Sequence, residues 1–123
     1  MRHHAVPVME FNPDIAILHV GTNSLRGDTE LKIAEDIVKL ATTIKTDTND
    51  ILVSSILPRR DQLKDKAEKV NDLLRIKCSQ SNVPYIRHNN IRSEMHLKPK
   101  GLHLNTKGSE LLSDNFAAYI NNA

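Results

Sequence analysis

The sequence predicts an α/β fold in which a parallel sheet is flanked by helices, because strand-like apolar runs alternate with segments of helical periodicity. The first run, IAILHV, occupies residues 15–20, and the second, ILVSSIL, occupies residues 51–57. Such runs are typical of strands buried on both faces of a parallel sheet. A third and shorter run, VPYI, occupies residues 83–86. The order strand, helix, strand, helix, strand, helix predicts about three parallel strands joined by right-handed crossovers.

Three helices are predicted because apolar residues recur at the spacing of one helical face. The first helix follows the potential N-caps Asp28 and Thr29. The last helix is capped by Asn105 or Thr106. The three apolar stripes consist of Leu31, Ala34, Ile37, Val38, Ala41 and Ile44, then Leu63, Ala67, Val70, Leu74 and Cys78, then Leu112, Phe116, Tyr119 and Ile120. Cys78 is the single cysteine, so an internal disulfide is excluded and a buried core thiol is predicted.

The length and charge of the chain restrict the class of protein. Its 123 residues fit one domain, so residues 1–123 are expected to form a single unit. The 17 Lys and Arg and 15 Asp and Glu are interspersed and give a net charge of +2, which argues against a dedicated polyanion-binding protein. No apolar run approaches the roughly 20 residues of a membrane span, and the N-terminus lacks a signal-peptide core. We therefore expect a soluble intracellular protein of the cytoplasm, without a membrane partner.

Two polar motifs lie where parallel sheets place their sites, at the carboxyl ends of strands. Gly21, Thr22 and Asn23 directly follow the first strand, and the side-chain NH2 of Asn23 could hold an oxyanion. His103, in the stretch GLHLN before the last helix, could act as a general base. Structural roles remain open for both, because Asn is an ordinary turn residue and a histidine between leucines can serve packing.

Together, PDIAILHVGTN and GLHLNTKGSELL resemble the SGNH hydrolase superfamily, also called GDSL esterases, and above all the esterase-like domains of some non-LTR retrotransposons. The resemblance runs from Asn12 onward and implies a three-layer flavodoxin-like fold. It implies that Asn23 is the oxyanion-hole asparagine, with Gly21 and Thr22 as supporting residues, and that His103 is the catalytic base. The implied activity of complete relatives is hydrolysis of small carboxylic or acetyl esters, without a metal or cofactor.

The chain departs from the family pattern in three places. The strands that carry the Gly-Asp-Ser nucleophile and the oxyanion glycine should precede residue 15, where only about a dozen residues stand. We therefore expect the C-terminal part of the domain, with residues 1–11 as the tail of a helix. Lys100 stands where the pattern Asp-x-x-His has the aspartate that orients the histidine, and Ser24 replaces an aspartate that often follows the asparagine. Without the serine and the aspartate, we expect an inactive domain.

No other hydroxyl residue is expected to replace the nucleophile. Asp28 and Thr29, in RGDT, follow the GTN loop rather than a strand of their own, and helix capping accounts for them. Ser54 and Ser55 reach the correct edge of the sheet, but strand alternation sends their side chains to opposite faces. Neither serine lies on an elbow turn.

Two other functions remain open. The chain could be a non-catalytic module, derived from a mobile element, that binds a partner or nucleic acid, or it could have no function of its own. Five basic residues could attract an anionic ligand, or they could simply belong to a solvated loop. They are Arg87, Arg92, Lys98, Lys100 and Lys107. Adjacent His3 and His4 do not predict a metal site, because neighbouring residues of a helix point in different directions. An open edge on strand 15–20 would favour self-association.

Overall fold

The computed structural model describes residues 8–12, 15–19, 25, 27–45, 50–101 and 103–121. Its elements follow in the order β1 (Val8–Asn12), β2 (Ile15–His19), α1 (Glu30–Lys45), β3 (Asp50–Ser54), α2 (Lys64–Gln80), β4 (Tyr85–Ile86) and α3 (Thr106–Asn121). The strands form one sheet in the order β1-β2-β3-β4, in which β2, β3 and β4 are parallel. The predicted α/β fold with three parallel strands is therefore confirmed.

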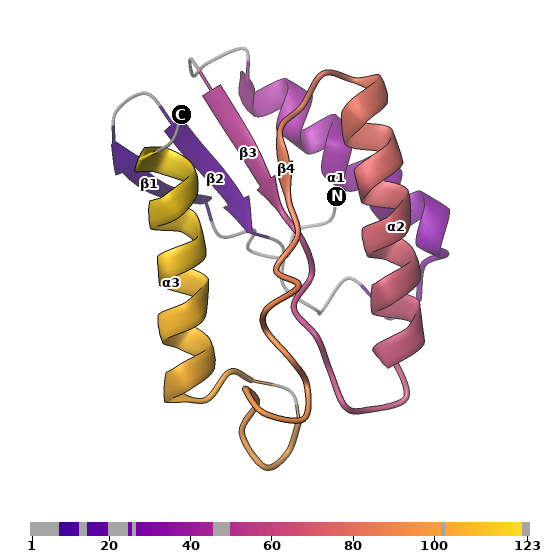
Figure 1. The fold of residues 1–123 in the computed structure, drawn as a ribbon. Coiled ribbons are helices and arrows are strands. Elements are labelled where there is room, and N and C mark those ends of the chain that lie inside the picture. The colour runs from indigo at the N-terminus through magenta and orange to yellow at the C-terminus, as the bar shows by residue number, and fades with distance from the viewer. Residues whose placement is uncertain are drawn as a thin grey trace.

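The sheet lies between two helical layers, with α1 and α2 on one face and α3 on the other (Figure 1). Because successive side chains of a strand point to opposite faces, Ala16 and Leu18 pack with α1 and α2, whereas Ile17 packs with α3. The core beside α1 and α2 contains sixteen buried residues, among them the predicted thiol of Cys78. Among the residues whose burial is described, three are fully buried in the core beside α3, namely Ile17, Leu52 and Phe116. Within this part of the chain, the attachment of α3 is the smaller of the two.

Side chains cap two of the helices, as the sequence predicts. The hydroxyl of Thr29 accepts a hydrogen bond from the backbone N–H of Lys32 at 3.2 Å, at the start of α1. The side-chain oxygen of Asn105 accepts one from the backbone N–H of Gly108 at 2.9 Å, at the start of α3. Each bond satisfies a donor that the first turn of a helix would otherwise leave unpaired. Among the described helices, none combines the length and hydropathy that a bilayer crossing requires.

The stripe predicted for α1 is wrong at its first residue. Leu31 is 46% exposed, whereas Ile33, which the prediction omitted, is buried. Leu31 lies on the flank of the stripe, and Ile33 lies closer to its centre line, where α1 faces the sheet. The remaining predicted stripes pack into the two cores, with Leu63 half-buried just before α2.

The expectation that residues 1–11 form the tail of a helix is wrong for residues 8–11. These residues belong to β1, which pairs antiparallel with β2 and contains a register shift between Glu10 and Asn12. Only two residues separate β1 from β2 in the sequence, which suits an antiparallel pair, and the free edge of β2 offers backbone partners that a helix would leave unpaired. The expected open edge on β2 is therefore occupied, and β1 is the outer strand.

Candidate active site at the carboxyl edge of the sheet

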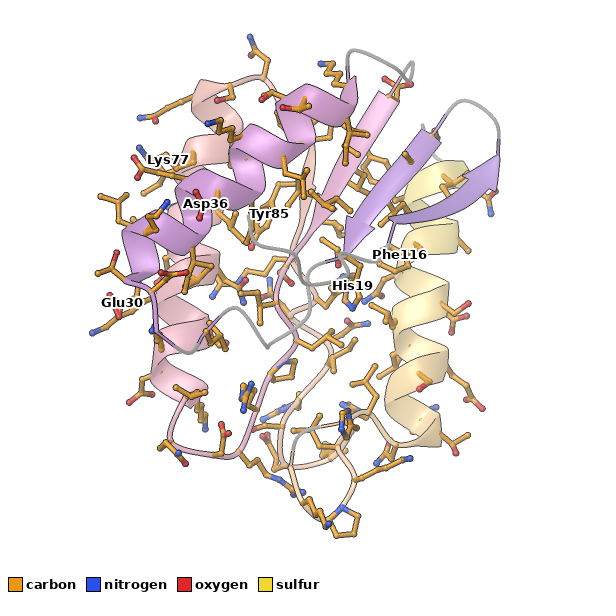
Figure 2. The ribbon with its side chains drawn as sticks, turned by 180° about the vertical axis from the view of Figure 1, so that it is seen from behind. His19, Glu30, Asp36, Lys77, Tyr85 and Phe116 are labelled. Atoms are coloured by element: carbon orange, nitrogen blue, oxygen red, sulfur yellow. The ribbon has the colours of Figure 1, made fainter. Side chains whose placement is uncertain are left out.

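A row of polar side chains lies at the carboxyl ends of the parallel strands, on the face that α3 covers. His19 ends β2, and its register partner Ser54 ends β3. Ser54 in turn pairs with Ile86 of β4, and His88 follows two residues later. The row lies beside Phe116 of α3, whose ring centroid is 6.2 Å from that of His19 and 5.2 Å from that of His88. Figure 2 shows His19 and Phe116 together between β2 and α3.

Hydrogen bonds join these side chains into one network. The Nδ1 atom of His19 lies 3.0 Å from Oγ of Ser54, and Nε2 of His88 lies 2.8 Å from the same oxygen. The amide nitrogen of Asn115, on α3, lies 2.9 Å from Nδ1 of His88. Asn115 and Asn90 exchange two further amide hydrogen bonds, of 2.8 and 3.0 Å. This hydrogen-bond network therefore connects β2, β3, the segment after β4, and α3.

The direction of the hydrogen bonds in this network follows from the donors and acceptors available. Because Asn115 donates to Nδ1 of His88, that ring carries its proton on Nε2 and donates it to Ser54. The hydroxyl of Ser54 lies 3.0 Å from Nδ1 of His19 and 3.5 Å from the carbonyl oxygen of Ser55, and either of these can accept its hydrogen. With Asn115 as the donor, His88 is neutral and carries its proton on Nε2.

Burial favours the neutral form of both imidazoles. Removal from water lowers the pKa of His88 to about 4, and the neighbouring His19 contributes to this shift. Burial also lowers the pKa of His19. Within the described part of the chain, no carboxylate forms a hydrogen bond with either ring. This histidine pair is therefore uncharged at neutral pH.

Ser54 and Ser55 are built into the fold and are closed to a substrate. Ser54 is 0% exposed and Ser55 is 2% exposed. The hydroxyl of Ser54 faces the two histidines, and the hydroxyl of Ser55 accepts the backbone N–H of His88 at 3.2 Å. Both hydroxyls have structural partners, in keeping with the expectation that neither serine is the nucleophile.

The predicted oxyanion motif lies outside the described residues, but the chain is fixed on both sides of it. Gly21, Thr22 and Asn23 fall in the range 20–24, for which no placement is given. His19, just before this range, is held by Ser54, and Leu25, just after it, is fully buried.

The predicted base, His103, lies in a hairpin-like loop before α3. Leu97 and Leu104 form an antiparallel bridge, and the N–H of Lys98 donates to the carbonyl of His103 at 2.7 Å. A tight turn at residues 98–101 connects the two arms and contains Lys100. The side chain of His103 is exposed, and no described residue forms a hydrogen bond with its ring. The structure thus leaves this imidazole open to a reacting group.

This loop is attached to the segment that leaves β3. The guanidinium of Arg60 donates to the carbonyls of Lys98 and Pro99, at 2.6 and 3.2 Å, and the backbone N–H of Arg60 donates to Gly101. Gly101 has a φ of +76°, and a Cβ atom there would lie 2.7 Å from Cβ of Arg60. Only glycine fits this turn without strain. The loop that carries His103 therefore extends from the carboxyl edge of the sheet, beyond the arrowheads of β2 and β3 (Figure 1).

The second histidine of this loop has a structural role. His96 is buried, and its Nδ1 accepts the backbone N–H of Arg92 at 2.8 Å. Its carbonyl accepts the N–H of Asn105, the residue that caps α3. Within MHLKPKGLHLN, one histidine thus holds the loop together and the other, His103, stays accessible.

The basic residues near the site divide into two groups. Arg87 forms ion pairs with Asp72 and Glu68, and Arg92 pairs with Glu94. In the described part of the chain, no ion pair involves the exposed residues Lys98, Lys100 and Lys107. A metal-binding group of three or more His, Cys, Asp or Glu side chains is also absent from the described ranges, which do not include His3 and His4.

The histidine pair was missed in the sequence, although a signal for it exists. His19 and Ser54 interrupt two strands that are otherwise apolar, and buried polar groups need partners. His88 lies 34 residues from Ser54, and Asn115 lies 27 residues from His88, so no local pattern marks these partners. The polar interruptions could have been identified, but their connection could not.

Comparison with solved structures shows which proteins share this fold. Est24, a carbohydrate acetylesterase from Sinorhizobium meliloti, matches with a TM-score of 0.76 and 18% identity over 92% of this chain. The aryl esterase of M. smegmatis matches with a TM-score of 0.78 and 20% identity over 92% of this chain. The chain has the fold of an α/β class of esterases. Within that class the fold is that of the SGNH, or GDSL, hydrolases, as the two sequence motifs predict.

The matches include a mobile-element domain and cover only part of each relative. The esterase domain of the ORF1 protein from the zebrafish ZfL2-1 retrotransposon matches with a TM-score of 0.67 and 26% identity over 86% of this chain. This chain spans 62% of Est24, 62% of the aryl esterase and 67% of the zebrafish domain. A curated relative, the platelet-activating factor acetylhydrolase IB subunit beta homolog of Drosophila melanogaster, is 37% identical over 68 residues, which are 51% of this chain and 30% of that protein. No family model matches the chain.

Proposed function

We propose that this chain is the part of an SGNH-type esterase domain that carries the oxyanion donor Asn23 and the base His103, and that it does not hydrolyse esters by itself. The observation that supports this most is the position of the two motifs. The Asn23 motif follows His19 at the end of β2, and the His103 loop is bonded to the segment that leaves β3. Both motifs thus start from the edge of the sheet where α/β folds place their sites.

The chemistry proposed for the complete domain divides ester hydrolysis into two steps. A serine from the part of the complete domain that lies upstream of this chain attacks the ester carbonyl, and its proton passes to His103. The amide of Asn23 donates to the oxyanion that develops. The carbon–oxygen bond of the ester breaks, and the alcohol leaves with the proton from His103. Water, activated by the same histidine, then releases the acid from the serine.

Two features of the described residues support the proposed lack of activity. The hydroxyls of Ser54 and Ser55 are buried in structural hydrogen bonds, and Thr29 caps α1. Lys100 stands where the family pattern has a carboxylate, so that position supplies no acceptor to orient the ring of His103. We therefore expect no turnover of a nitrophenyl acetate and no labelling of these three residues by a fluorophosphonate. Labelling of any of them, with loss of turnover on its mutation, would refute the inactivity.

The proposed function is tested by adding the upstream strands that carry the serine nucleophile in complete relatives. The segment of the zebrafish retrotransposon esterase domain that precedes its GTN-type strand is fused ahead of Met1, and acetyl ester hydrolysis is measured. We expect activity that depends on the serine of the added segment. Lys100→Asp should raise this activity by orienting His103 and stabilising its charged form. Lys100→Asn is the matched control, because it removes the cation without supplying a carboxylate, and should restore less.

A second candidate function is supported by three lysines in the His103 loop and the first turn of α3, none of which forms an ion pair within the described part of the chain. Lys98, Lys100 and Lys107 are exposed and could contact the phosphates of a single-stranded nucleic acid. Retention on an immobilised oligonucleotide should then fall as salt rises, and glutamine at all three positions should weaken it. Glutamine at Lys39 and Lys69, which are exposed on α1 and α2, is the control. Equal effects of the two sets would mean that binding is only a general response to charge.

Self-association through β1 is a further proposal about partners. β1 is the outer strand of the sheet, and an outer strand offers backbone groups for pairing with another chain. Sedimentation analysis should reveal dimers whose fraction rises with protein concentration. A monomer over the whole concentration range would contradict this proposal.

A further inference from the structure

The attachment of α3 to the sheet has one apolar part and one polar part. The apolar part is the small core around Phe116, Ile17 and Leu52. The polar part is the hydrogen bond from Asn115 to His88, supported by the amide pair of Asn115 and Asn90. The opposite face of the sheet is held by a core of sixteen buried residues. Because elements with few buried contacts open at lower free energy, α3 should open before α1 and α2.

The polar part fits a neutral His88. His19 and His88 share the hydroxyl of Ser54, so a charge on one ring disfavours a charge on the other. A protonated His88 would also present an N–H to the amide NH2 of Asn115, which places two donors face to face. The contact could be restored only if the amides of Asn115 and Asn90 both turned over.

The charged groups around His88 do not offer a hydrogen bond that would compensate for protonation. The pocket beside this residue is lined by the charged side chains of Lys64, Glu68, Arg87, Arg92 and Glu94. Both carboxylates of this set already pair with arginines, Glu68 with Arg87 and Glu94 with Arg92. The elements packed on the ring contribute His19 from β2, the uncharged Ser54 from β3, and the uncharged Asn115 and Phe116 from α3.

We propose that protonation of the His19 and His88 pair releases α3 from the sheet, and that mild acid thereby exposes the carboxyl end of β2. The release of α3 stands on the contacts described above. The consequence for catalysis rests on the proposed function. In a complete domain, acid would loosen the packing at the carboxyl end of β2 and reduce ester hydrolysis.

The direction of the pH effect follows from the two histidines. Burial lowers the pKa of His88 to about 4 and lowers that of His19, whereas a histidine exposed by opening has a pKa of about 6.5. The opened state therefore binds protons that the closed state does not. The stabilisation is fully present above pH 6.5 and is lost as the pH falls from there toward 4. Each histidine that takes up a proton on opening raises the opening equilibrium constant by about tenfold per pH unit in this window.

Hydrogen exchange of the backbone amides tests this proposal on the chain without any ester. After correction for the intrinsic pH dependence of exchange, the opening constant of α3 should rise by about tenfold or more per pH unit below 6.5. The amides of α1 and α2 should keep their protection. The His88→Gln variant keeps a donor and an acceptor but cannot titrate in this range, so it should reduce the slope. The control His96→Gln replaces another buried histidine and should leave the slope unchanged.

Three outcomes would overturn the proposal. These are loss of protection in α1 and α3 together, an opening of α3 that ignores pH, and a slope that His88→Gln leaves intact. If His88→Gln does not fold, ring nitrogen shifts of the unmodified chain decide the matter. At pH 7 His88 should carry its proton on Nε2, and both rings should titrate below the ordinary histidine pKa of about 6.5 while the chain is folded. Titration of either ring near pH 6.5 in the folded chain would exclude the mechanism.

Discussion

Replacing Ser54 with alanine should destabilise the chain far more than the loss of one oxygen atom implies. The hydroxyl accepts a hydrogen bond from His88 and lies 3.0 Å from Nδ1 of His19, so its removal leaves an N–H and a ring nitrogen without this partner. Each unsatisfied buried polar group costs about 1–3 kcal/mol, which gives a loss of about 2–6 kcal/mol for the two groups. The usual stability of a domain is only about 5–15 kcal/mol, so the effect should be large.

Urea unfolding at pH 7.5, followed by circular dichroism, measures this loss. Ser55→Ala is the matched control, because Ser55 is equally buried but its hydroxyl accepts only the backbone N–H of His88. The control should lose about 1–3 kcal/mol, since one donor is left unpaired. A loss below about 0.5 kcal/mol for Ser54→Ala, or a larger loss for the control, would refute the hydrogen-bond network.

Two further substitutions test the loop that carries His103. Asn105→Ala removes the cap of α3 at Gly108 and should cost about 1 kcal/mol in thermal unfolding, whereas Asn105→Asp, which keeps the acceptor, should cost less. An equal loss in both variants would mean that the cap is not the cause. Gly101→Ala forces a side chain into a turn with a φ of +76° against Arg60 and should cost more than about 1 kcal/mol. It should also shift the NMR signals of His103, and unchanged signals would argue that Arg60 does not hold this loop.

The fold was accessible from the sequence because its signals are local. Apolar runs and helical stripes mark the parallel strands and the three helices, and the caps Thr29 and Asn105 mark where two of the helices begin. The predicted burial of Leu31 was wrong because a residue on the flank of a stripe is buried only if a neighbour covers it. β1 was not predicted because an outer strand forms by pairing with a neighbour, and its own five residues do not determine that pairing.

The candidate site was accessible only in part. The two family motifs single out Asn23 and His103 by residue type and spacing, and the structure adds that His103 is exposed on a loop bonded to Arg60. The histidine pair was not accessible, because it depends on strand register and on the docking of Asn115, which join residues far apart in the chain. Polar residues in a buried strand indicate that hydrogen-bond partners exist, but they do not identify those partners.

The central claim, that Asn23 and His103 occupy the oxyanion and base positions of an SGNH-type domain, is tested most directly by kcat/KM for acetyl ester hydrolysis in the fusion that restores the upstream strands. Asn23→Ala should lower this value by about 10²-fold or more, as loss of one oxyanion donor does. His103→Ala should abolish the serine-dependent rate, while Lys39→Ala on α1 should leave it unchanged. A folded and active fusion whose rate ignores both Asn23 and His103 would contradict the claim and leave the two residues as a turn former and a loop histidine.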